Sequence, residues 1–370
     1  MVHQVRQART RKIMISFSAT RPFIIAGPCG VESAAQLTQL GSALQALPVQ
    51  LFRAGIWKPR TRPGSFEGMG EEGLKWLTAF KQQFGIPVAV EVATPAHVEL
   101  ALKYGIDALW IGARTTVSPF NVQDIADAVK GVSIPVLVKN PVNPDVTLWQ
   151  GAIERFRNSG ITELAAIHRG FSSYDHTGPY RNKPNWAIPI ELRRRMPELP
   201  IINDPSHIAG KRGLLLGVAQ KALDLGFEGL MVEVHPHPEA AWSDADQQLT
   251  PAAFEKMLGD LVVRKPSTED SAVKGTLEYY RQIIDGIDAE VVDLIGKRME
   301  LALQLGDLKK QCNLTAYIPE RWQEIVETRT ERGKKNNLDA NLILHLFELI
   351  HQESIRIQTE VMNQAALKNS

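Results

Sequence analysis

The sequence predicts a (β/α)8 TIM barrel followed by an all-α helical domain. Two observations carry this expectation. Eight short apolar runs alternate with helix-like stretches from Phe23 onward, and a helical period replaces that alternation after the polar segment Val262 to Gly275. We therefore expect a barrel domain over 1–264, a linker over 265–274 and a helical domain over 275–370.

The eight apolar runs are the expected strands, in chain order FIIAG, VQLFRAGIW, VAVEVAT, ALWIGA, PVLVKN, LAAIHRG, PIINDPS and GLMVEV. Apolar residues are continuous rather than alternating along most of these runs, which is typical of a parallel sheet that is covered on its outside. Eight such β/α units most simply close into a barrel. A doubly wound open sheet is the alternative.

The helical tail is predicted from the spacing of its apolar residues. Between Leu277 and about Lys310, one row holds Leu277, Ile284, Val291 and Leu305, and a neighbouring row holds Ile287, Leu294, Leu301 and Leu308. This spacing indicates a long amphipathic helix. We expect a second helix after Pro319 and a third from Leu338 towards Gln364.

Composition limits the classes of function. The chain has 370 residues, 44% of them hydrophobic, which is enough for a sizeable core. The net charge of +1 leaves no electrostatic footprint for nucleic acid or an anionic membrane, so small anionic ligands fit better. Sparse cysteines suit a reducing compartment, and neither a signal peptide nor a transmembrane run is evident, so we expect a cytoplasmic protein.

The active site of a (β/α)8 barrel lies at the C-terminal ends of its strands. Four residues at or beyond these ends are of metal-ligand type: Cys29, His207, Glu233 and Asp244. A mixed thiolate, imidazole and carboxylate set suits Mn, Fe, Co or Zn better than Mg or Ca. Each residue alone has an ordinary structural explanation, such as a buried cysteine or a helix cap, but four at one barrel mouth favour a divalent metal site.

Six cationic residues lie on or follow the same strands: Arg53, Lys58, Arg60, Arg114, Lys139 and Arg169. Unpaired positive charge beside a cleft is unfavourable because it loses solvation. Anionic ligands compensate it, and guanidinium groups bind phosphate or carboxylate in a bidentate way. We therefore expect two phosphorylated substrates, or one phosphate together with a carboxylate. Ordinary salt bridges to acids of the helices are the alternative.

Polar residues also interrupt the apolar rows of the tail. Arg298 lies on the row between Val291 and Leu305, where an apolar residue is expected. The other polar residues on or beside the apolar seams are Arg281, Lys309, Ser354 and Gln358. Polar groups on two facing seams suggest a small pocket between helices, and a dimerising hairpin without a pocket is the alternative.

The motifs AGPCGVES, RAGIWKPRTRPGSFEG, IGARTT, VLVKNP, IHRGF, INDPSH and VEVHPHPEAAWSDADQQ together resemble a short type I 3-deoxy-D-arabino-heptulosonate-7-phosphate (DAHP) synthase. The resemblance covers about Phe23 to Leu261. It implies that the four metal-type residues bind a divalent metal, with manganese favoured. It also implies phosphoenolpyruvate held by Arg53, Lys58, Arg114, Lys139 and Arg169, and erythrose 4-phosphate held by Arg60 and Thr61. Octulosonate-phosphate synthases share part of the pattern, but KPRT resembles the heptulosonate enzyme.

The tail motifs YRQIIDGIDAEVVDLIGKRMELALQLGDLKKQ, IPER and LFELIHQESIRIQ resemble an all-α chorismate mutase. The resemblance implies substrate-binding positions at Arg281, Arg298, Lys309, Arg321, Ser354 and Gln358, with Arg281 supplied by the partner of an intertwined dimer. Two positions depart from that family, because Trp322 and Ile318 stand where many members have acids. Contact with the chorismate hydroxyl then falls to Glu320 or Glu324, or the activity is low.

Together the two resemblances imply a bifunctional enzyme of the shikimate pathway. The first domain condenses phosphoenolpyruvate with erythrose 4-phosphate, with Lys58 as a proton shuttle, and the second rearranges chorismate to prephenate. Similar fusions imply that prephenate inhibits the synthase through the tail of a homodimer or larger oligomer. The alternatives are a weak, regulatory tail or a binding protein that only senses phosphorylated metabolites.

Overall fold

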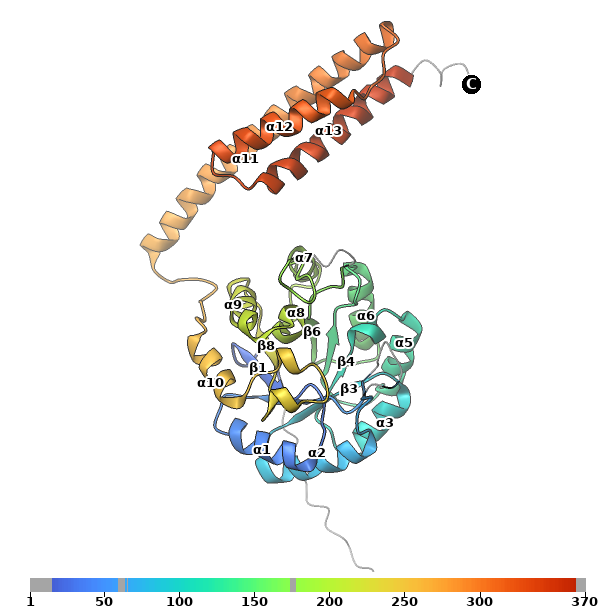
Figure 1. The fold of residues 1–370 in the computed structure, drawn as a ribbon, viewed down its shortest axis with the longest axis vertical. Coiled ribbons are helices and arrows are strands. Elements are labelled where there is room, and N and C mark those ends of the chain that lie inside the picture. The colour runs from blue at the N-terminus through green and yellow to red at the C-terminus, as the bar shows by residue number, and fades with distance from the viewer. Residues whose placement is uncertain (1–14, 59–63, 65, 174–177, 364–370) are drawn as a thin grey trace, which may run out of the picture. The chain divides into compact units, whose positions relative to one another are not determined.

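The chain separates into two compact units, which are described one after the other: 1–266 and 267–370. The computed structural model describes residues 15–58, 64, 66–173 and 178–363, and Figure 1 shows the course of the chain. In the first unit, parallel strands β1 to β8 pair in chain order and close into a barrel. This closure confirms the predicted barrel and excludes the open sheet.

Each strand lies within its predicted run: β1 Phe23–Gly27, β2 Leu51–Ala54, β3 Val88–Val92, β4 Ala108–Ile111, β5 Val136–Lys139, β6 Leu164–His168, β7 Ile201–Asn203 and β8 Gly229–Glu233. The barrel closes at β1, where Ile25 is in register with Leu51 of β2 on one side and with Met231 of β8 on the other.

Helices surround the strands on the outside of the barrel (Figure 1). They are α1 Ala34–Leu44, α2 Glu71–Phe84, α3 Pro95–Lys103, α4 Ala113–Thr116, α5 Pro119–Ala128, α6 Val146–Asn158, α7 Ala187–Arg195, α8 Pro205–Ala209, α9 Leu215–Asp224 and α10 Pro251–Asp260, with 3-10 turns η1 Arg212–Leu214, η2 Pro238–Ala240 and η3 Ala245–Gln247. Several begin at a side chain that caps a backbone N–H, as Ser33 does for α1 and Asp145 for α6.

Alternate residues of each strand belong to two separate apolar clusters. Ile25, Leu137 and Met231 are part of a cluster that fills the barrel interior. Their strand neighbours Ile24 and Val232 belong to the cluster that packs against the surrounding helices. Both faces of the sheet are therefore buried, which explains why the strands read as continuous apolar runs.

In the second unit, the residues described up to 363 form three helices: α11 Ser271–Gln311, α12 Pro319–Lys335 and α13 Ala340–Asn363. Asp270 caps α11 by accepting hydrogen bonds from the backbone N–H groups of Ala272 and Val273, at 2.9 and 3.2 Å. The first turn of α11 therefore lies within the segment predicted as linker. α13 packs against both α11 and α12, and Gly306 permits close approach, because a Cβ there would lie 2.9 Å from Gln358 Cα.

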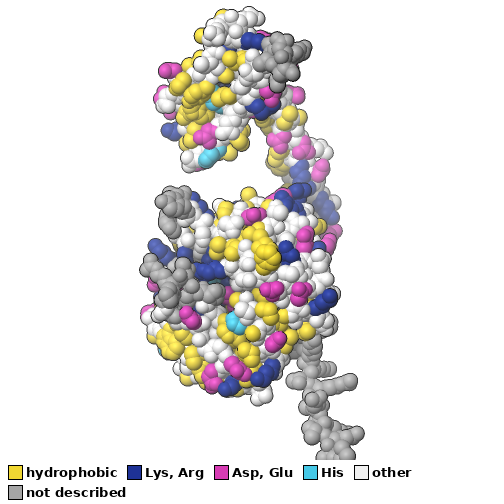
Figure 2. All heavy atoms as spheres, turned by 90° about the vertical axis from the view of Figure 1, so that its right-hand side faces the viewer, with side chains coloured by type: hydrophobic (Ala, Val, Ile, Leu, Met, Phe, Trp, Pro, Cys, Tyr) yellow, Lys and Arg dark blue, Asp and Glu magenta, His cyan; other side chains and the backbone are white. Residues whose placement is uncertain are grey.

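The first half of α11 has no cover within its own unit (Figure 1). Its apolar residues, including Leu277, Ile284 and Ile287, are exposed, and the first buried residue of the helix is Ala302. Figure 2 shows hydrophobic side chains gathered on the visible face of this unit. Over the described residues, none of the helices combines the length and the apolar character that crossing a membrane requires.

Candidate active site

The barrel interior becomes charged at the carboxyl ends of its strands. Successive side chains of a strand point to opposite faces of the sheet, so a residue two positions after an inward-facing apolar residue also points into the barrel. Arg53 follows Leu51 by this step, and Glu233 follows Met231. Lys139, Arg169 and Asp204 follow interior apolar residues of β5, β6 and β7 in the same way. The strands thus place a layer of charge on top of an apolar core.

Two ion pairs compensate most of this buried charge. Arg53 Nη2 lies 3.0 Å from Glu233 Oε1, and Lys139 Nζ lies 3.0 Å from Asp204 Oδ2. All four side chains are buried. The Arg53 guanidinium also lies over the Trp110 ring, 5.4 Å from its centroid. Because an uncompensated charge here would be strongly destabilising, each pair depends on both partners.

The four residues of metal-ligand type form two close pairs. Cys29 Sγ lies 3.1 Å from Asp244 Oδ2, and His207 Nε2 lies 3.8 Å from Glu233 Oε1. The charge of Glu233 acts on Cys29, and that of Asp244 acts on Glu233, so the two pairs are within electrostatic reach of each other. Across the described residues, however, no three His, Cys, Asp or Glu side chains are already arranged to hold a metal ion.

Protein cations occupy the donor atoms of this cluster instead. Lys58 Nζ donates to Cys29 Sγ at 2.7 Å and to Ser243 Oγ at 3.0 Å. Arg181 Nη1 donates to Asp244 Oδ1 at 2.8 Å, and Arg53 pairs with Glu233 as described above. The cluster therefore attracts positive charge at three of its four members.

The chemistry of the donor set fits a divalent transition metal. Burial, reinforced by the charge of Glu233, raises the pKa of the Cys29 thiol to about 12. Burial also lowers the pKa of His207, which keeps the imidazole in the neutral form that binds metals. Glu233 Oε1 is buried and accepts no well-directed hydrogen bond. A bound dication would stabilise the thiolate and compete with Arg53 for this carboxylate oxygen.

Three arginines lie near one another at this end of the barrel. Arg169 is half-buried, and its burial, together with the nearby guanidinium groups of Arg181 and Arg114, lowers its pKa to about 10. Asp204 and Asp244 oppose this shift only in part. Neighbouring guanidinium groups of this kind suit an anion, because they can bind phosphate or carboxylate in a bidentate way.

Asn140 fixes the backbone at Arg169. Its Oδ1 accepts from the Arg169 N–H at 2.7 Å, and its Nδ2 donates to Gly170 O at 2.7 Å. The Arg169 side chain donates in turn to Asn182 Oδ1 at 2.8 Å. These contacts fix where the guanidinium group enters the site.

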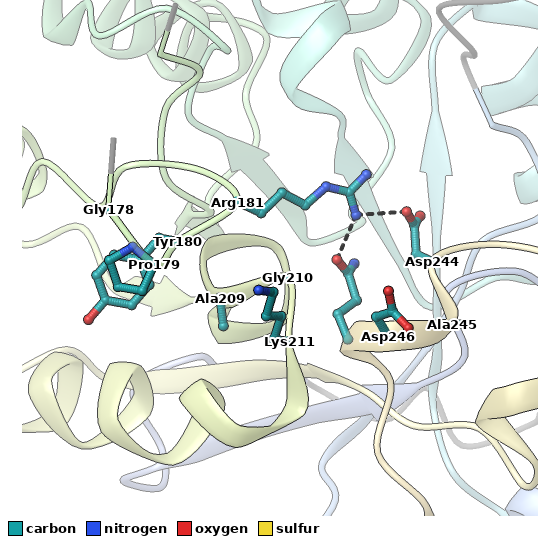
Figure 3. A pocket seen from close by; sticks show the side chains of 11 residues that line it. Gly178, Pro179, Tyr180, Arg181, Ala209, Gly210, Lys211, Asp244, Ala245 and Asp246 are labelled. Carbon is teal, nitrogen blue, oxygen red and sulfur yellow. Dashed lines mark hydrogen bonds and ion pairs between the residues drawn. The ribbon is translucent and has the colours of Figure 1, made fainter. Parts of the chain in front are cut away.

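A pocket of about 540 Å³ lies beside the metal-type cluster, between the end of α8 and η3. Arg181 reaches across it towards Asp244 and Gln247, as Figure 3 shows, and it donates to Gln247 Oε1 at 2.7 Å. Lys211 also lines the pocket. Two cations therefore face the open side of the cluster.

The sequence-based site is found in part. Arg53, Lys58, Arg114, Lys139 and Arg169 lie at the same end of the barrel as the metal-type residues. Arg60 and Thr61 lie outside the described residues, so their predicted role in binding erythrose 4-phosphate stays a prediction. Sequence reasoning missed Arg181, Asn140 and Asp204. Arg181 lies in a long loop, where no strand end marks it.

The helical unit has a second polar cluster, along the seam between α11 and α13. The Arg298 guanidinium donates to Ser354 Oγ and, at 3.4 Å, to Ile350 O. Lys309 is buried beside the same seam and donates to Ala316 O at 2.6 Å. Gln358 is buried one helical turn beyond Ser354.

Two predicted residues are exposed and pair with acids of their own helices, although Arg321 lies near enough to Arg298 to help lower the pKa of Arg298. Arg281 is exposed on the first half of α11 and lies 3.8 Å from Glu278. Arg321 is exposed on α12 and pairs with Glu324 at 2.5 Å. A single copy of the unit therefore does not bring all six predicted residues together.

Comparison with known proteins decides the family. A model described as the DAHP synthetase I family matches residues 7–264, and one described as chorismate mutase type II matches residues 280–359. The chain belongs to the DAHP synthetase I family. It carries a DAHP synthase domain and a chorismate mutase domain, which confirms both resemblances drawn from the motifs and makes the chain a bifunctional enzyme of the shikimate pathway.

Relatives of the DAHP synthase domain agree with this assignment. A phospho-2-dehydro-3-deoxyheptonate aldolase of Thermotoga maritima is 34% identical over 240 residues, which are 64% of this chain and 68% of that protein. A crystal structure of the Thermotoga enzyme covers 64% of this chain and 67% of its own, with 31% identity and a TM-score of 0.58. A 2-dehydro-3-deoxyphosphooctonate aldolase of Synechococcus is 26% identical over 266 residues, which are 67% of this chain and 91% of that protein.

Asp204 is the acid that links Lys139 to His207, because its Oδ2 lies 3.0 Å from Lys139 Nζ and 2.8 Å from His207 Nδ1. In an Asp204→Asn variant the α8 cap is retained, since asparagine caps as well as aspartate. The buried ammonium group nevertheless loses its counter-charge. We expect the free energy of unfolding of the barrel to fall by about 3 to 5 kcal/mol, measured by urea denaturation.

The matched control is Asp260→Asn, which breaks the exposed ion pair between Lys256 Nζ and Asp260 Oδ2, 2.6 Å apart. It should change stability by less than about 0.5 kcal/mol. Equal effects of the two variants would show that burial does not strengthen the dependence of Lys139 on Asp204.

Proposed function

We propose that the barrel condenses phosphoenolpyruvate with erythrose 4-phosphate and water to give DAHP and inorganic phosphate. One observation carries the proposal: Arg169, with two further guanidinium groups close enough to lower its pKa, lies next to a sulfur, nitrogen and oxygen donor set at one end of the barrel. This combination suits two anionic substrates and a divalent metal. The Thermotoga relative, named as the heptulosonate enzyme, supports the same reaction.

The cations of the charge layer position the enol phosphate in this proposal. Arg169, Arg114 and Lys139 hold its phosphate and carboxylate groups, and Arg53 supports the layer from below through Glu233. Fixing the substrate in this way lowers the entropic barrier to bond formation. C3 of phosphoenolpyruvate then bonds to the aldehyde carbon, water adds at C2, and phosphate leaves as its C–O bond breaks.

Cys29, His207, Glu233 and Asp244 would hold the divalent metal, with manganese favoured. When bound, such an ion supplies Lewis acidity at the aldehyde oxygen. Lys58 acts as the proton shuttle in this scheme, because its ammonium group lies against Cys29 Sγ and Ser243 Oγ at the edge of the donor set. A proton from Lys58 would neutralise the alkoxide that forms as the carbon–carbon bond closes.

Removing the metal tests this proposal. Thorough chelation should lower phosphate release by at least about 100-fold, since a Lewis-acid contribution of several kcal/mol is lost, and added Mn²⁺ should restore it. Cys29→Ala should lose activity in the same way and should also bind Mn²⁺ more weakly in a calorimetric titration.

Cys312→Ala is the matched control, because Cys312 is exposed and lies in the helical unit. A Cys29→Ala variant that stays fully active after chelation would contradict the metal assignment. Arabinose 5-phosphate is the control substrate, and a preference for it over erythrose 4-phosphate would instead assign the octulosonate reaction.

We propose that the helical unit rearranges chorismate to prephenate at the seam between α11 and α13. This pericyclic reaction needs no nucleophile, so positioned charges and hydrogen bonds are sufficient. Arg298 and Ser354 hold a carboxylate, and Lys309 and Gln358 donate to the ether oxygen as it becomes negative. Burial of Lys309 and Gln358 supports this role, because hydrogen bonds are stronger where water is excluded.

We also propose that the helical unit forms a homodimer through α11, between Leu277 and Leu294. The exposed apolar row there requires a cover, and a second copy would supply one together with its own Arg281. The exposed fractions of Ile284, Ile287 and Leu294 are 55%, 54% and 63%. An exposed apolar surface of this kind usually marks an interface.

Leu294→Lys tests the dimer by placing a charge in the apolar row. The variant should shift towards monomer in sedimentation equilibrium, because a desolvated lysine is unfavourable in an apolar interface. Glu300→Lys, which introduces a lysine and a larger change of charge outside the two rows, is the control and should leave the mass unchanged. An unchanged mass for Leu294→Lys would place the interface elsewhere.

We propose that prephenate inhibits the synthase through the helical unit. This coupling requires that prephenate bind two states of the chain with different affinity. The separation of the chain into two compact units supports a division between catalysis and sensing. The mutase product is the effector that such a fused domain already recognises.

Truncation tests this regulation. Full-length protein should be inhibited by prephenate, whereas a chain of residues 1–266 should remain active with an inhibition constant about 5- to 150-fold higher, the usual range of allosteric coupling. Full-length Arg298→Met should lose inhibition as well, if the mutase pocket is the sensor. Unchanged inhibition of the truncated chain would exclude the helical unit.

A further inference from the structure

Neither acid that the sequence offers for the chorismate hydroxyl lies in the mutase seam. Glu324 is exposed and pairs with Arg321 at 2.5 Å. Glu320 is exposed in the first turn of α12. Because Trp322 and Ile318 stand where acids are common in this family, the group that recognises the hydroxyl must come from another position.

Unpartnered polar atoms indicate that position. Among the described residues of 267–370, the buried side-chain nitrogen and oxygen atoms without a hydrogen bond are His351 Nε2 and Gln358 Oε1. The two residues lie on α13, seven positions apart, with Ser354 between them. They therefore share one face of the helix with the residue that Arg298 contacts.

Trp322 holds the His351 ring in place. The two rings are stacked, with centroids 4.4 Å apart and an angle of 17° between their planes. Tyr317 packs edge-on against the same imidazole at 6.0 Å. The tryptophan that replaces the acid therefore fixes the orientation of a different polar group.

The surroundings keep His351 neutral. Burial lowers the pKa of its imidazole, and the positive charges of Arg298 and Lys309 act in the same direction. Their influence also shows that His351 lies close to both cations of the seam. A neutral imidazole nitrogen either donates or accepts a hydrogen bond, depending on its tautomer.

We propose that His351 Nε2 binds the ring hydroxyl of chorismate and that Trp322 is its positioning residue. The inference rests on the proposed mutase function. In it, a stacked Trp–His pair takes the place of the missing acid. Leaving a buried nitrogen unpaired is unfavourable, and a substrate hydroxyl would satisfy it. A site of this kind discriminates against a substrate that lacks the hydroxyl, because the nitrogen then stays unpaired.

The experiment compares kcat/KM of the full chain for chorismate and for its analogue without the ring hydroxyl. Wild-type protein should favour chorismate by roughly 5- to 150-fold, the range expected when a buried polar group gains its partner. His351→Leu should lower kcat/KM for chorismate by a similar factor and leave the analogue unaffected. His351→Gln, which keeps a polar nitrogen near the same place, should recover part of the preference.

Two further variants separate recognition from folding. His345→Leu is the matched control on α13, because His345 is exposed, and it should retain the full preference. Trp322→Ala should reduce the preference for chorismate, whereas Trp322→Phe, which preserves a stacking ring, should keep most of it. Circular dichroism confirms that each variant is folded.

Equal losses for both substrates in His351→Leu would overturn the inference and leave the mutase function intact, because they would indicate a structural role only. A wild-type chain that converts neither substrate would instead overturn the proposed mutase function, and with it this inference. The two failures are therefore distinguishable.

Discussion

Compensation of buried charge at the carboxyl end of the barrel is the constraint on which the synthase domain depends. Successive side chains of each strand point into the apolar barrel interior and towards the apolar outer layer in turn. The last inward-facing side chains of several strands are charged, and together they form a layer of charge that is shielded from water. Arg53 is stable there because Glu233 is 3.0 Å away, and Lys139 because Asp204 is equally close. The fold therefore requires acids and bases at matched positions of different strands.

The compensation is incomplete where ligands are expected to bind. The guanidinium groups of Arg114 and Arg181 lie close enough to Arg169 to lower its pKa, so these arginines suit anions. The neighbouring thiol, imidazole and carboxylate groups attract cations, and protein ammonium and guanidinium groups already lie against them. One end of the barrel can thus receive two substrates of negative charge and an ion of positive charge.

The helical unit uses a different principle. Its chemistry needs only orientation and a few strong hydrogen bonds, which buried groups on facing helices provide. Arg298 and Lys309 come from α11, whereas Ser354, Gln358 and His351 come from α13. Within the described part of the chain, two buried polar atoms of α13, His351 Nε2 and Gln358 Oε1, have no hydrogen-bond partner. The polar atoms without hydrogen bonds at the helix seam and the uncovered apolar row are both groups that one copy of the helical unit leaves without a partner.

Sequence by itself determined the eight strands, the three tail helices and the residue types of both sites, because periodicity and strand-end position are local properties of the chain. It did not determine which charges pair. Arg181 lies in a loop and Asp204 looks like a helix cap, yet the first meets Asp244 and the second meets Lys139. The Trp322–His351 stack likewise joins residues of two helices. Only tertiary structure decides such contacts, because they depend on how separate elements approach one another in space.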